Sequence, residues 1–381
     1  MDNDKSVRYL HELVTMLMEK NGSDLFITAG SPPALKVSGE ILRVGQNKLT
    51  PQHSEILVRS VMNDRQRAHF DAHQEVGFSL NFPDLARFRV SVFRQRNSAG
   101  MVMRLIPSQV PTLHQLNLPT RLGELAMADR GMILFVGGTG CGKSSSLAAM
   151  VDHRNERSRG HVITIEDPIE FYHQHKSCLV NQREIGVDAE SYGIALKSAL
   201  RQAPNVILVG EIRDRETMDY AINFAETGHL FMSTLHANNT NQALDRIINF
   251  FPEARRPQLL MDLAFNLRAF VSQRLIRRAD QEGLIPAVEI LLNTPLMSEL
   301  IFQGRLHEIK PAMAKSSEQG LLTFDQSLFE LYEAGKISYE SALRYADSTN
   351  NLRLQIKLHS KRPLPDSLKG SVDEIKLKMK G

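Results

Sequence analysis

The eight residues from Gly137 to Ser144 constrain the fold of this chain more than any other part of the sequence. They read Gly-Gly-Thr-Gly-Cys-Gly-Lys-Ser, which fits the pattern G-x-x-x-x-G-K-[ST]. Glycines let the backbone N–H groups of such a loop turn inward around phosphate groups at the N-terminus of a helix. The apolar run Met132–Val136 precedes the loop, and the helix-compatible segment Ser145–Val151 follows it. The sequence therefore predicts a strand, a phosphate-binding loop and a helix in succession.

Two side chains of this loop have distinct predicted roles. We expect Lys143 to reach the β- and γ-phosphates of ATP, and Ser144 to hold Mg²⁺. A glycine-rich turn with a coincidental Lys-Ser pair is the alternative, but the flanking strand and helix patterns argue against it. The predicted cofactors are thus ATP and Mg²⁺. The residues expected to bind them are Gly137, Gly138, Thr139, Gly140, Cys141, Gly142, Lys143, Ser144 and Ser145.

Short, almost wholly apolar runs recur after residue 130, with helical patterns between them. This alternation predicts an α/β fold in which helices cover both faces of a parallel sheet. Beyond residue 255 the sequence is expected to be mostly helical, from Leu259 to Ile276 and again from Phe324 to Tyr345. The apolar runs are Met132–Val136, Val162–Ile165, Val206–Val209 and Leu230–Met232.

Residues 1–106 are predicted to form a separate, smaller α+β domain with an antiparallel sheet. Apolar residues recur at helical spacing from Val7 to Met18, and short strand patterns follow. Apolar and polar residues alternate over Phe88–Val92. After a turn at residues 97–100, the run Met101–Ile106 is expected to complete a hairpin.

Prolines and charge suggest how the rest of the chain is organised. Three prolines punctuate residues 107–119 and indicate a semi-rigid linker. We expect the phosphate-loop domain, with a helical C-terminal region, over residues 120–358, and a basic flexible tail over 359–381. Apolar and polar residues alternate over residues 352–358, which predicts a half-buried strand there.

Composition limits the class of protein. The chain has 381 residues, two cysteines, no tryptophan and a formal net charge of +3. Two cysteines exclude a disulfide framework and a four-cysteine zinc site. No apolar run reaches the roughly 18 residues that span a bilayer, and the acidic N-terminus does not resemble a secretion signal. We therefore expect a cytoplasmic protein, and the weak charge gives little support for a nucleic acid as partner.

Two glutamates that follow apolar strands are candidate catalytic residues. Glu211 comes after Val206–Val209, and ligands of open α/β sheets bind at such strand ends, so Glu211 is expected to face Mg²⁺ or the attacking water. Glu166 ends another apolar run and is a candidate for orienting that water. In isolation, each acid would more often be a helix cap or a solvated surface group. The sequence leaves open which glutamate has which role.

The strand pattern around Leu230–Met232 lies between two histidines, His229 and His236. A histidine at a strand end could sense the γ-phosphate or relay its presence through hydrogen bonds. His229 is the candidate for this role, and a partly buried structural histidine is the alternative.

Five arginines cluster in the N-terminal region. One or two of them are candidate arginine fingers that act on ATP held by a neighbouring subunit. The alternative is a solvated basic sheet edge. The five are Arg87, Arg89, Arg94, Arg96 and Arg104.

These motifs, in this order, resemble the secretion ATPase superfamily of type II secretion and type IV pilus machines. Ile163–Glu170 is similar to the superfamily's Asp box, Leu200–Asp214 to its Walker B segment, and Gly228–His236 to its His box. The likeness extends over about residues 5–358. It implies an N-terminal PAS-like α+β domain, a C-terminal RecA-like P-loop core with a helical C-terminal region, and a homohexamer.

Within the superfamily, the sequence looks like the PilT-like branch of pilus retraction motors, on residues 22–27, 87–90 and 323–326. Three features depart from that branch. Asn205 stands where the Walker B segment usually has aspartate, Pro295–Ile301 replaces a motif that contains an arginine, and a tail extends past residue 358. Together these departures resemble an accessory member of the branch.

The resemblance implies an ATPase that drives or assists pilus retraction in twitching motility. Its implied partners are a PilT-type retraction ATPase and an inner-membrane pilus platform protein, which would hold the cytoplasmic ring against the inner membrane. One alternative is an ATP-binding structural ring with little turnover of its own. A RecA-like nucleic-acid translocase is a further alternative.

Overall fold

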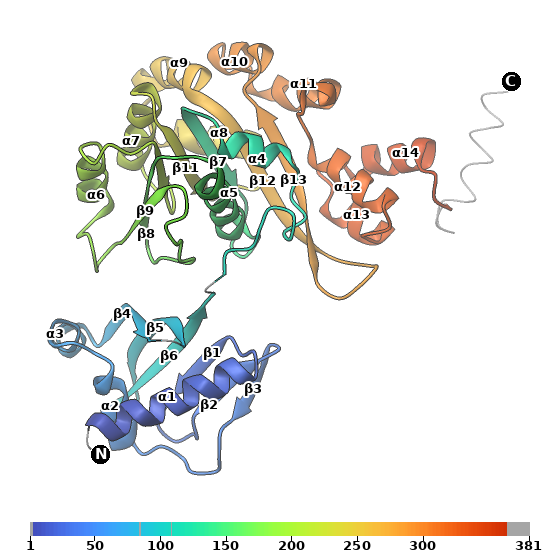
Figure 1. Ribbon diagram of the computed structural model, residues 1–381. Coiled ribbons are helices and arrows are strands. Elements are labelled where there is room, and N and C mark those ends of the chain that lie inside the picture. The colour runs from blue at the N-terminus through green and yellow to red at the C-terminus, as the bar shows by residue number, and fades with distance from the viewer. Residues whose placement is uncertain (1–2, 84, 108, 364–381) are drawn as a thin grey trace, which may run out of the picture. The chain divides into compact units, whose positions relative to one another are not determined.

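The computed structural model describes residues 3–83, 85–107 and 109–363 (Figure 1). The chain divides into two compact units. The first contains Met1–Val110 together with two short segments, Asp167–Tyr172 and Glu184–Asp188, and the second contains the rest of the chain. The first unit is therefore not one continuous stretch of sequence.

The first unit is built on a six-stranded sheet in the order β3-β2-β1-β6-β5-β4, and all of its pairings are antiparallel. Leu10, Leu13 and Leu17 of the first helix are buried because their spacing of three or four residues places them on one face. The expected helix and antiparallel sheet are confirmed. The elements are α1 (Asn3–Glu19), β1 (Asp24–Ile27), β2 (Ala34–Val37), β3 (Glu40–Arg43), α2 (Pro51–Ser60), α3 (Asp64–His73), β4 (Glu75–Phe82), β5 (Ala86–Gln95) and β6 (Ser98–Ile106).

Strands β5 and β6 form the predicted hairpin, but its turn lies earlier than expected. Gln95 pairs with Ser98, so the turn consists of Arg96 and Asn97, with φ values of 46° and 60°. Gly100 belongs to β6 rather than to the turn. A Cβ at Gly100 would lie 3.2 Å from the ring of Phe93, so a small residue is needed there for packing.

The second unit contains a seven-stranded sheet in the order β13-β12-β7-β11-β10-β8-β9. Strands β8, β10, β11 and β7 pair in parallel, as the apolar runs predict. Strand β12 also pairs in parallel with β7, and β13 pairs antiparallel with β12. The strands are β7 (Gly131–Val136), β8 (His161–Glu166), β9 (Leu179–Glu184), β10 (Val206–Val209), β11 (Leu230–Leu235), β12 (Leu267–Arg277) and β13 (Leu284–Leu292).

One helix of this unit, α4, precedes these strands, and the others lie between or after them (Figure 1). They are α4 (Arg121–Ala126), α5 (Lys143–Arg157), α6 (Tyr192–Ala199), α7 (Arg215–Glu226), α8 (Thr240–Asn249), α9 (Arg256–Asn266), α10 (Pro295–Phe302), α11 (Ile309–Lys315), α12 (Phe324–Glu333), α13 (Tyr339–Tyr345) and α14 (Thr349–His359). Short 3₁₀ turns occupy Glu253–Arg255, Leu306–Glu308 and Ser317–Gln319.

The expected helix from Leu259 to Ile276 is wrong in its second half. Helix α9 ends at Asn266, and β12 begins at the next residue. Strand β12 lies between β7 and β13, and its central residues 269–273 are buried. A short apolar run that is buried on both faces fits a helix or a strand equally well by periodicity, so the sequence pattern could not distinguish them.

The expected strand over residues 352–358 is also wrong, because this segment lies within α14. Ser348 caps the helix by accepting a hydrogen bond from Asn351 N. Leu352 and Ile356, one helical turn apart, are buried with α12 and α13, whereas Leu354 is 50% exposed. The alternation along the sequence therefore reflects one buried helical stripe. The predicted tail over 359–381 lies largely outside the described residues.

The helices do not include a candidate membrane span. Across residues 3–83, 85–107 and 109–363, no helix is long and apolar enough to cross a bilayer.

Candidate active site

The carboxyl ends of four parallel strands meet at one edge of the seven-stranded sheet. Leu235 of β11 pairs with Val136 of β7, and Val209 of β10 pairs with Ser233 of β11 and Ile165 of β8. Residues that end or follow these strands therefore share that edge, where open α/β sheets bind ligands. They include Gly137, Glu166, Glu211 and His236.

The loop after β7 has a conformation that requires glycine. Gly137 and Gly142 have φ values of 154° and 90°. A Cβ at Gly137 would lie 2.4 Å from Cys141 Sγ, and a Cβ at Gly142 would lie 2.6 Å from Gln273 Nε2. No described side chain caps the N-terminus of α5. The first N–H groups of that helix are therefore available to an anion, as the loop pattern predicts.

Lys143 is buried within the loop, with 8% of its surface exposed. Its Nζ donates to the carbonyl oxygens of Gly137 at 2.8 Å and Gly138 at 2.9 Å. No carboxylate pairs with Lys143 in the described part of the chain, so its charge is balanced only by peptide dipoles. Ser144 and Ser145 follow in the first turn of α5 and are half-buried. The donor-rich, anion-free loop fits the phosphates of ATP.

Gln273, on β12, forms hydrogen bonds with the phosphate loop and the first turns of α5. It is not among the predicted site residues. It is 4% exposed. Its Nε2 donates to Cys141 O at 2.8 Å, and its Oε1 accepts from Ser146 Oγ at 2.8 Å. The sequence gives no signal for this role, because its pattern predicts a helix over the segment that contains Gln273.

Glu211 lies beyond β10 and is fixed by its neighbours. Thr234 Oγ1 donates to Gly210 O at 2.8 Å, which ties this turn to β11. The two carboxylate oxygens of Glu211 contact different side chains. Oε1 lies 3.1 Å from His236 Nε2, and Oε2 lies 2.8 Å from Arg213 Nε. The carboxylate is thus held at the strand end, with 15% of its side chain exposed.

Glu166, at the end of β8, occupies the position that the sequence predicts. Thr164 Oγ1 donates to its Oε1 at 2.6 Å, and Gln182 Nε2 lies 3.3 Å from the same atom. Both of these donors are neutral and lie on the same sheet as Glu166.

His229 does not lie at the phosphate-loop edge. It precedes β11, and its backbone oxygen accepts from Gly131 N at 3.0 Å, at the start of β7. The length of β11 places it roughly 20 Å from the loop. Its Nδ1 contacts Phe224 O and Thr227 Oγ1 at 3.1 and 3.0 Å. Direct contact between His229 and a γ-phosphate in this loop is therefore excluded, and the histidine at the loop edge is His236.

The rule that ligands bind at the carboxyl ends of strands could have selected His236 from the sequence. His229 precedes its strand, whereas His236 follows it directly.

Three of the five candidate arginines have acidic partners. Arg104 Nε lies 2.7 Å from Asp24 Oδ1. Arg94 donates to both oxygens of Glu55 at 3.3 Å. The third, Arg87, lies 3.9 Å from Glu184 Oε2 and over the ring of Tyr172.

The other two arginines, Arg89 and Arg96, are exposed. Neither has an ion-pair partner among the residues that the structure describes.

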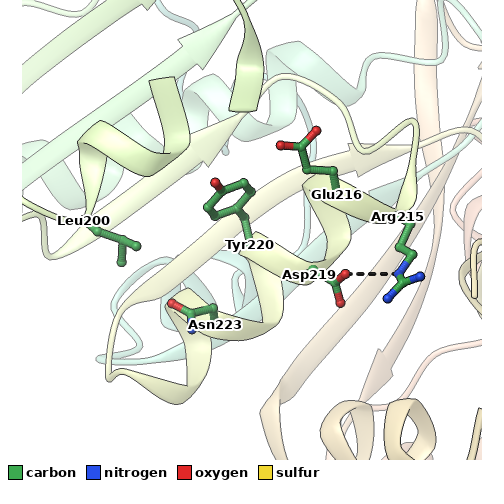
Figure 2. A pocket seen from close by; sticks show the side chains of 6 residues that line it. All are labelled: Leu200, Arg215, Glu216, Asp219, Tyr220 and Asn223. Atoms are coloured by element: carbon green, nitrogen blue, oxygen red, sulfur yellow. Dashed lines mark hydrogen bonds and ion pairs between the residues drawn. The ribbon is translucent and has the colours of Figure 1, made fainter. Parts of the chain in front are cut away.

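A cavity of about 740 Å³ adjoins the phosphate loop. Its lining combines Gly137, Gly138 and Thr139 with residues 236–238 and the polar face of α8. A second cavity, of about 630 Å³, lies on α7 near Leu200, where Arg215 pairs with Asp219 at 3.2 Å (Figure 2). None of the predicted site residues lines this second cavity.

A parallel sheet with a glycine-rich loop before a helix, and acids at the neighbouring strand ends, defines a P-loop nucleotide-binding fold. The family model described as "Type II/IV secretion system protein" matches residues 1–317. The chain belongs to this family, and it is an ATPase with a RecA-like core and an additional N-terminal domain.

Three comparisons with known proteins agree with this assignment. The type IV pilus ATPase PilU of Pseudomonas aeruginosa is 54% identical over 349 residues, which cover 92% of this chain and 91% of that protein. The retraction ATPase PilT of the same organism is 39% identical over 89% of this chain and 98% of its own length. A crystal structure of the retraction motor PilT with bound ADP covers 90% of this chain and 98% of that one, at 37% identity and a TM-score of 0.85.

Proposed function

We propose that this protein is an ATPase of the type IV pilus machine that drives or assists pilus retraction. The observation that carries the proposal is its 54% identity, over 92% of the chain, to a protein named as a type IV pilus ATPase. The sheet edge with Lys143, Glu166 and Glu211 supplies the chemistry that such an activity needs.

The loop and Lys143 bind the phosphates. The amides of the loop and of the first turn of α5 bind the phosphate oxygens. Lys143 then exchanges its two carbonyl contacts for the β- and γ-phosphates.

The order of the strands suggests different roles for the two glutamates. Glu211 follows β10, two strands from β7, and Glu166 ends β8, three strands from β7. At the usual spacing between strands these offsets are roughly 10 and 14 Å. We therefore assign Glu211, with Ser144, to Mg²⁺ binding, and Glu166 to orienting the attacking water. Bound Mg²⁺ would neutralise charge that develops on the phosphates.

His236 replaces His229 as the histidine that faces the nucleotide. It lines the cavity beside the loop and lies 3.1 Å from Glu211. A hydrogen-bonding group there can respond to the γ-phosphate and move the carboxylate with it. His229 retains a proposed role only as a relay at the far end of β11.

We infer a homohexamer in which an N-terminal arginine of one subunit reaches ATP on the next. Arg89 and Arg96 are the preferred fingers because both are exposed without an ion-pair partner among the described residues. The proposed domain boundaries remain 1–106, 107–119, 120–358 and 359–381.

The proposed partners are a PilT-type retraction ATPase and an inner-membrane pilus platform protein, which would place the ring in the cytoplasm against the inner membrane. The segment Pro295–Ile301, which forms most of α10, lacks the arginine of the retraction motif. This difference favours an accessory role and also motivates the alternative, a ring that binds ATP with little turnover.

Phosphate release by the purified protein tests the proposal, with Lys143→Ala as the comparison. We expect turnover in the wild type and its loss in Lys143→Ala, with the same thermal unfolding midpoint within a few degrees. Co-purification with a PilT-type motor, with and without ATP, tests the accessory role. Wild-type protein that binds ATP but releases no phosphate, even with that motor present, would favour the structural ring.

A further inference from the structure

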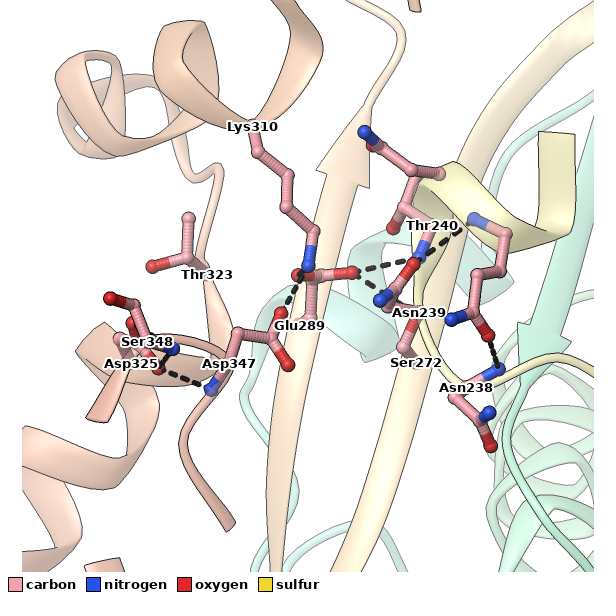
Figure 3. Close-up of polar contacts among 12 residues, drawn as sticks. Asn238, Asn239, Thr240, Ser272, Glu289, Lys310, Thr323, Asp325, Asp347 and Ser348 are labelled. Carbon is pink, nitrogen blue, oxygen red and sulfur yellow. Dashed lines mark hydrogen bonds and ion pairs between the residues drawn. The ribbon is translucent and has the colours of Figure 1, made fainter. Parts of the chain in front are cut away.

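A buried carboxylate on β13 holds the end of the segment that carries His236. Glu289 is fully buried. Its Oε1 accepts hydrogen bonds from Thr240 N at 2.9 Å and from Ser272 Oγ at 3.4 Å (Figure 3). Thr240 is the first residue of α8 and follows directly on residues 236–239. The position of Glu289 therefore fixes where this segment meets the helix.

The charge of Glu289 is balanced from α11. Lys310 Nζ lies 3.4 Å from Glu289 Oε2, and it also pairs with Asp347 Oδ2. Among the described residues, no donor hydrogen-bonds to Oε2. A buried carboxylate is strongly destabilised when its cationic partner is removed. The position of α11 and the contact between Glu289 and Thr240 therefore depend on each other.

A second connection runs beside the first. Arg274 of β12 donates through Nη2 to Asn238 O at 3.4 Å, and the same atom lies 2.7 Å from Asp347 Oδ1. Asp347 thus forms ion pairs with both Lys310 and Arg274. Burial acts to raise the pKa of Asp347, but hydrogen bonds from Lys310 and Arg274 outweigh it and lower that pKa below its usual range.

Asp347 also joins the C-terminal helices to one another. Its backbone N–H donates to Asp325 Oδ1 of α12 at 2.8 Å, and the N-cap of α14, Ser348, donates to the same carboxylate. The network therefore reaches from the lining of the nucleotide cavity to α11, α12 and α14 (Figure 3). Apolar packing can often replace a buried ion pair without loss of stability. The contacts to the backbone of residues 238 and 240, however, need polar side chains.

We propose that Glu289, Lys310 and Arg274 are positioning residues that couple the segment 236–239 to the C-terminal helices. Displacement of α11 then moves the segment 236–239 and changes the rate of ATP turnover. Nucleotide binding beside that segment also changes the protection of α11, because coupling between two equilibria is reciprocal. The proposal rests on the nucleotide site proposed above. Through these contacts, the C-terminal region, which contains the divergent segment Pro295–Ile301, can influence ATP hydrolysis at the nucleotide site.

The test compares Lys310→Met with Lys315→Met, an exposed lysine at the end of the same helix. We expect Lys310→Met to lower kcat at least about fivefold, or roughly 1 kcal/mol of barrier. Its ADP affinity should stay within about twofold of wild type, since the phosphate loop is untouched. Lys315→Met should match the wild type in both.

The double variant Glu289→Gln/Lys310→Met supplies a rescue. Glutamine keeps an oxygen for Thr240 N and leaves no buried charge without a partner, so we expect kcat to return to within about twofold of wild type. Hydrogen exchange over residues 309–315, with and without ADP, adds a readout that a purely structural role would not move. ADP should alter this exchange in the wild type and in Lys315→Met, but not in Lys310→Met.

Equal kcat and equal ADP-dependent exchange in Lys310→Met and Lys315→Met would overturn the proposed coupling. In that case, loss of turnover in Lys143→Ala would still support the nucleotide site. Turnover that survives Lys143→Ala would instead reject the proposed function. If Lys310→Met does not fold, Arg274→Gln serves as the test variant, because it removes the contacts of Arg274 with Asn238 O and Asp347. Its kcat and its ADP-dependent exchange over residues 309–315 are then compared with those of the wild type.

Discussion

Gln273 Nε2 donates a hydrogen bond to the carbonyl oxygen of Cys141, 2.8 Å away, from a strand more than 120 residues further along the chain. In a trans peptide the carbonyl and the following N–H point in opposite directions. Holding the Cys141 carbonyl toward Gln273 therefore turns the N–H of Gly142 away from Gln273. The side-chain amide of Gln273 thus fixes the orientation of one peptide of the loop.

Replacing this amide with a carboxylate should weaken nucleotide binding. In Gln273→Glu the donor to Cys141 O is lost, and an anionic oxygen faces that carbonyl in a buried site. We expect ADP affinity to fall at least about tenfold, roughly 1.4 kcal/mol, in a titration with a fluorescent ADP analogue. Gln281→Glu, at an exposed position, is the matched control. Equal affinity of Gln273→Glu and the control would remove Gln273 from the site.

The pair formed by Glu211 and His236 can be tested with a double-mutant cycle on kcat. The two side chains are 3.1 Å apart, so Glu211→Gln and His236→Ala should show an interaction energy between about 0.5 and 3 kcal/mol. Glu211→Gln combined with His229→Ala should be additive within about 0.5 kcal/mol, because His229 lies at the other end of β11. Additivity in the first cycle, or equal coupling in both, would contradict the assignment of His236.

Glu166→Gln should lower kcat severely and leave ADP binding intact. The amide keeps the shape of the side chain and its contact with Thr164 Oγ1, but it cannot accept a proton from water. Phosphate release at saturating ATP measures the effect, and Glu190→Gln, at an exposed position, is the control. If Glu166→Gln keeps more than about half of wild-type kcat, a change of less than roughly 0.4 kcal/mol in the barrier, then Glu166 does not activate the attacking water.

The phosphate loop could be predicted because its chemistry is local. Eight consecutive residues determine the backbone turn, the position of Lys143 and the start of α5, so the spacing alone carries the geometry. The positions of Glu166 and Glu211 at strand ends could be predicted for a similar reason, since each follows an apolar run with the pattern of a strand. In each of these cases, residues that act together are close in sequence or are ordered by one rule about strand ends.

What the sequence could not provide depends on contacts between distant segments. Gln273 meets the loop only because β12 pairs beside β7, and the apolar pattern of β12 fits a helix as well as a strand. The choice between His229 and His236 depends on the direction of β11, which the parallel register fixes. Glu289 reads as one acid within an apolar run, and its role appears only once Thr240 and Lys310 are brought beside it.

A buried histidine makes the stability of the second unit depend on pH. The pKa of His173 is lowered to about 4, chiefly by burial; the charge of Asp152 opposes this effect, and the charge of Lys176 adds to it. In the unfolded chain the same ring titrates near 6.5. Between these values the unfolded chain binds more protons, so lowering the pH favours unfolding. The stabilisation is thus fully present above about pH 6.5 and is lost as the pH falls toward 4.

Removing this ring should make unfolding less sensitive to acid. The Nδ1 atom of His173 has no hydrogen-bond partner among the described residues, so His173→Leu loses no bond at that atom. Between pH 7.5 and pH 5, we expect the free energy of unfolding of the wild type to fall by about 2 kcal/mol more than that of His173→Leu. Urea denaturation at the two pH values measures this, and His114→Gln, at an exposed position, is the control. If the wild type and His173→Leu lose the same free energy on acidification, His173 is protonated in the folded protein as readily as in the unfolded chain, and the buried neutral ring is ruled out.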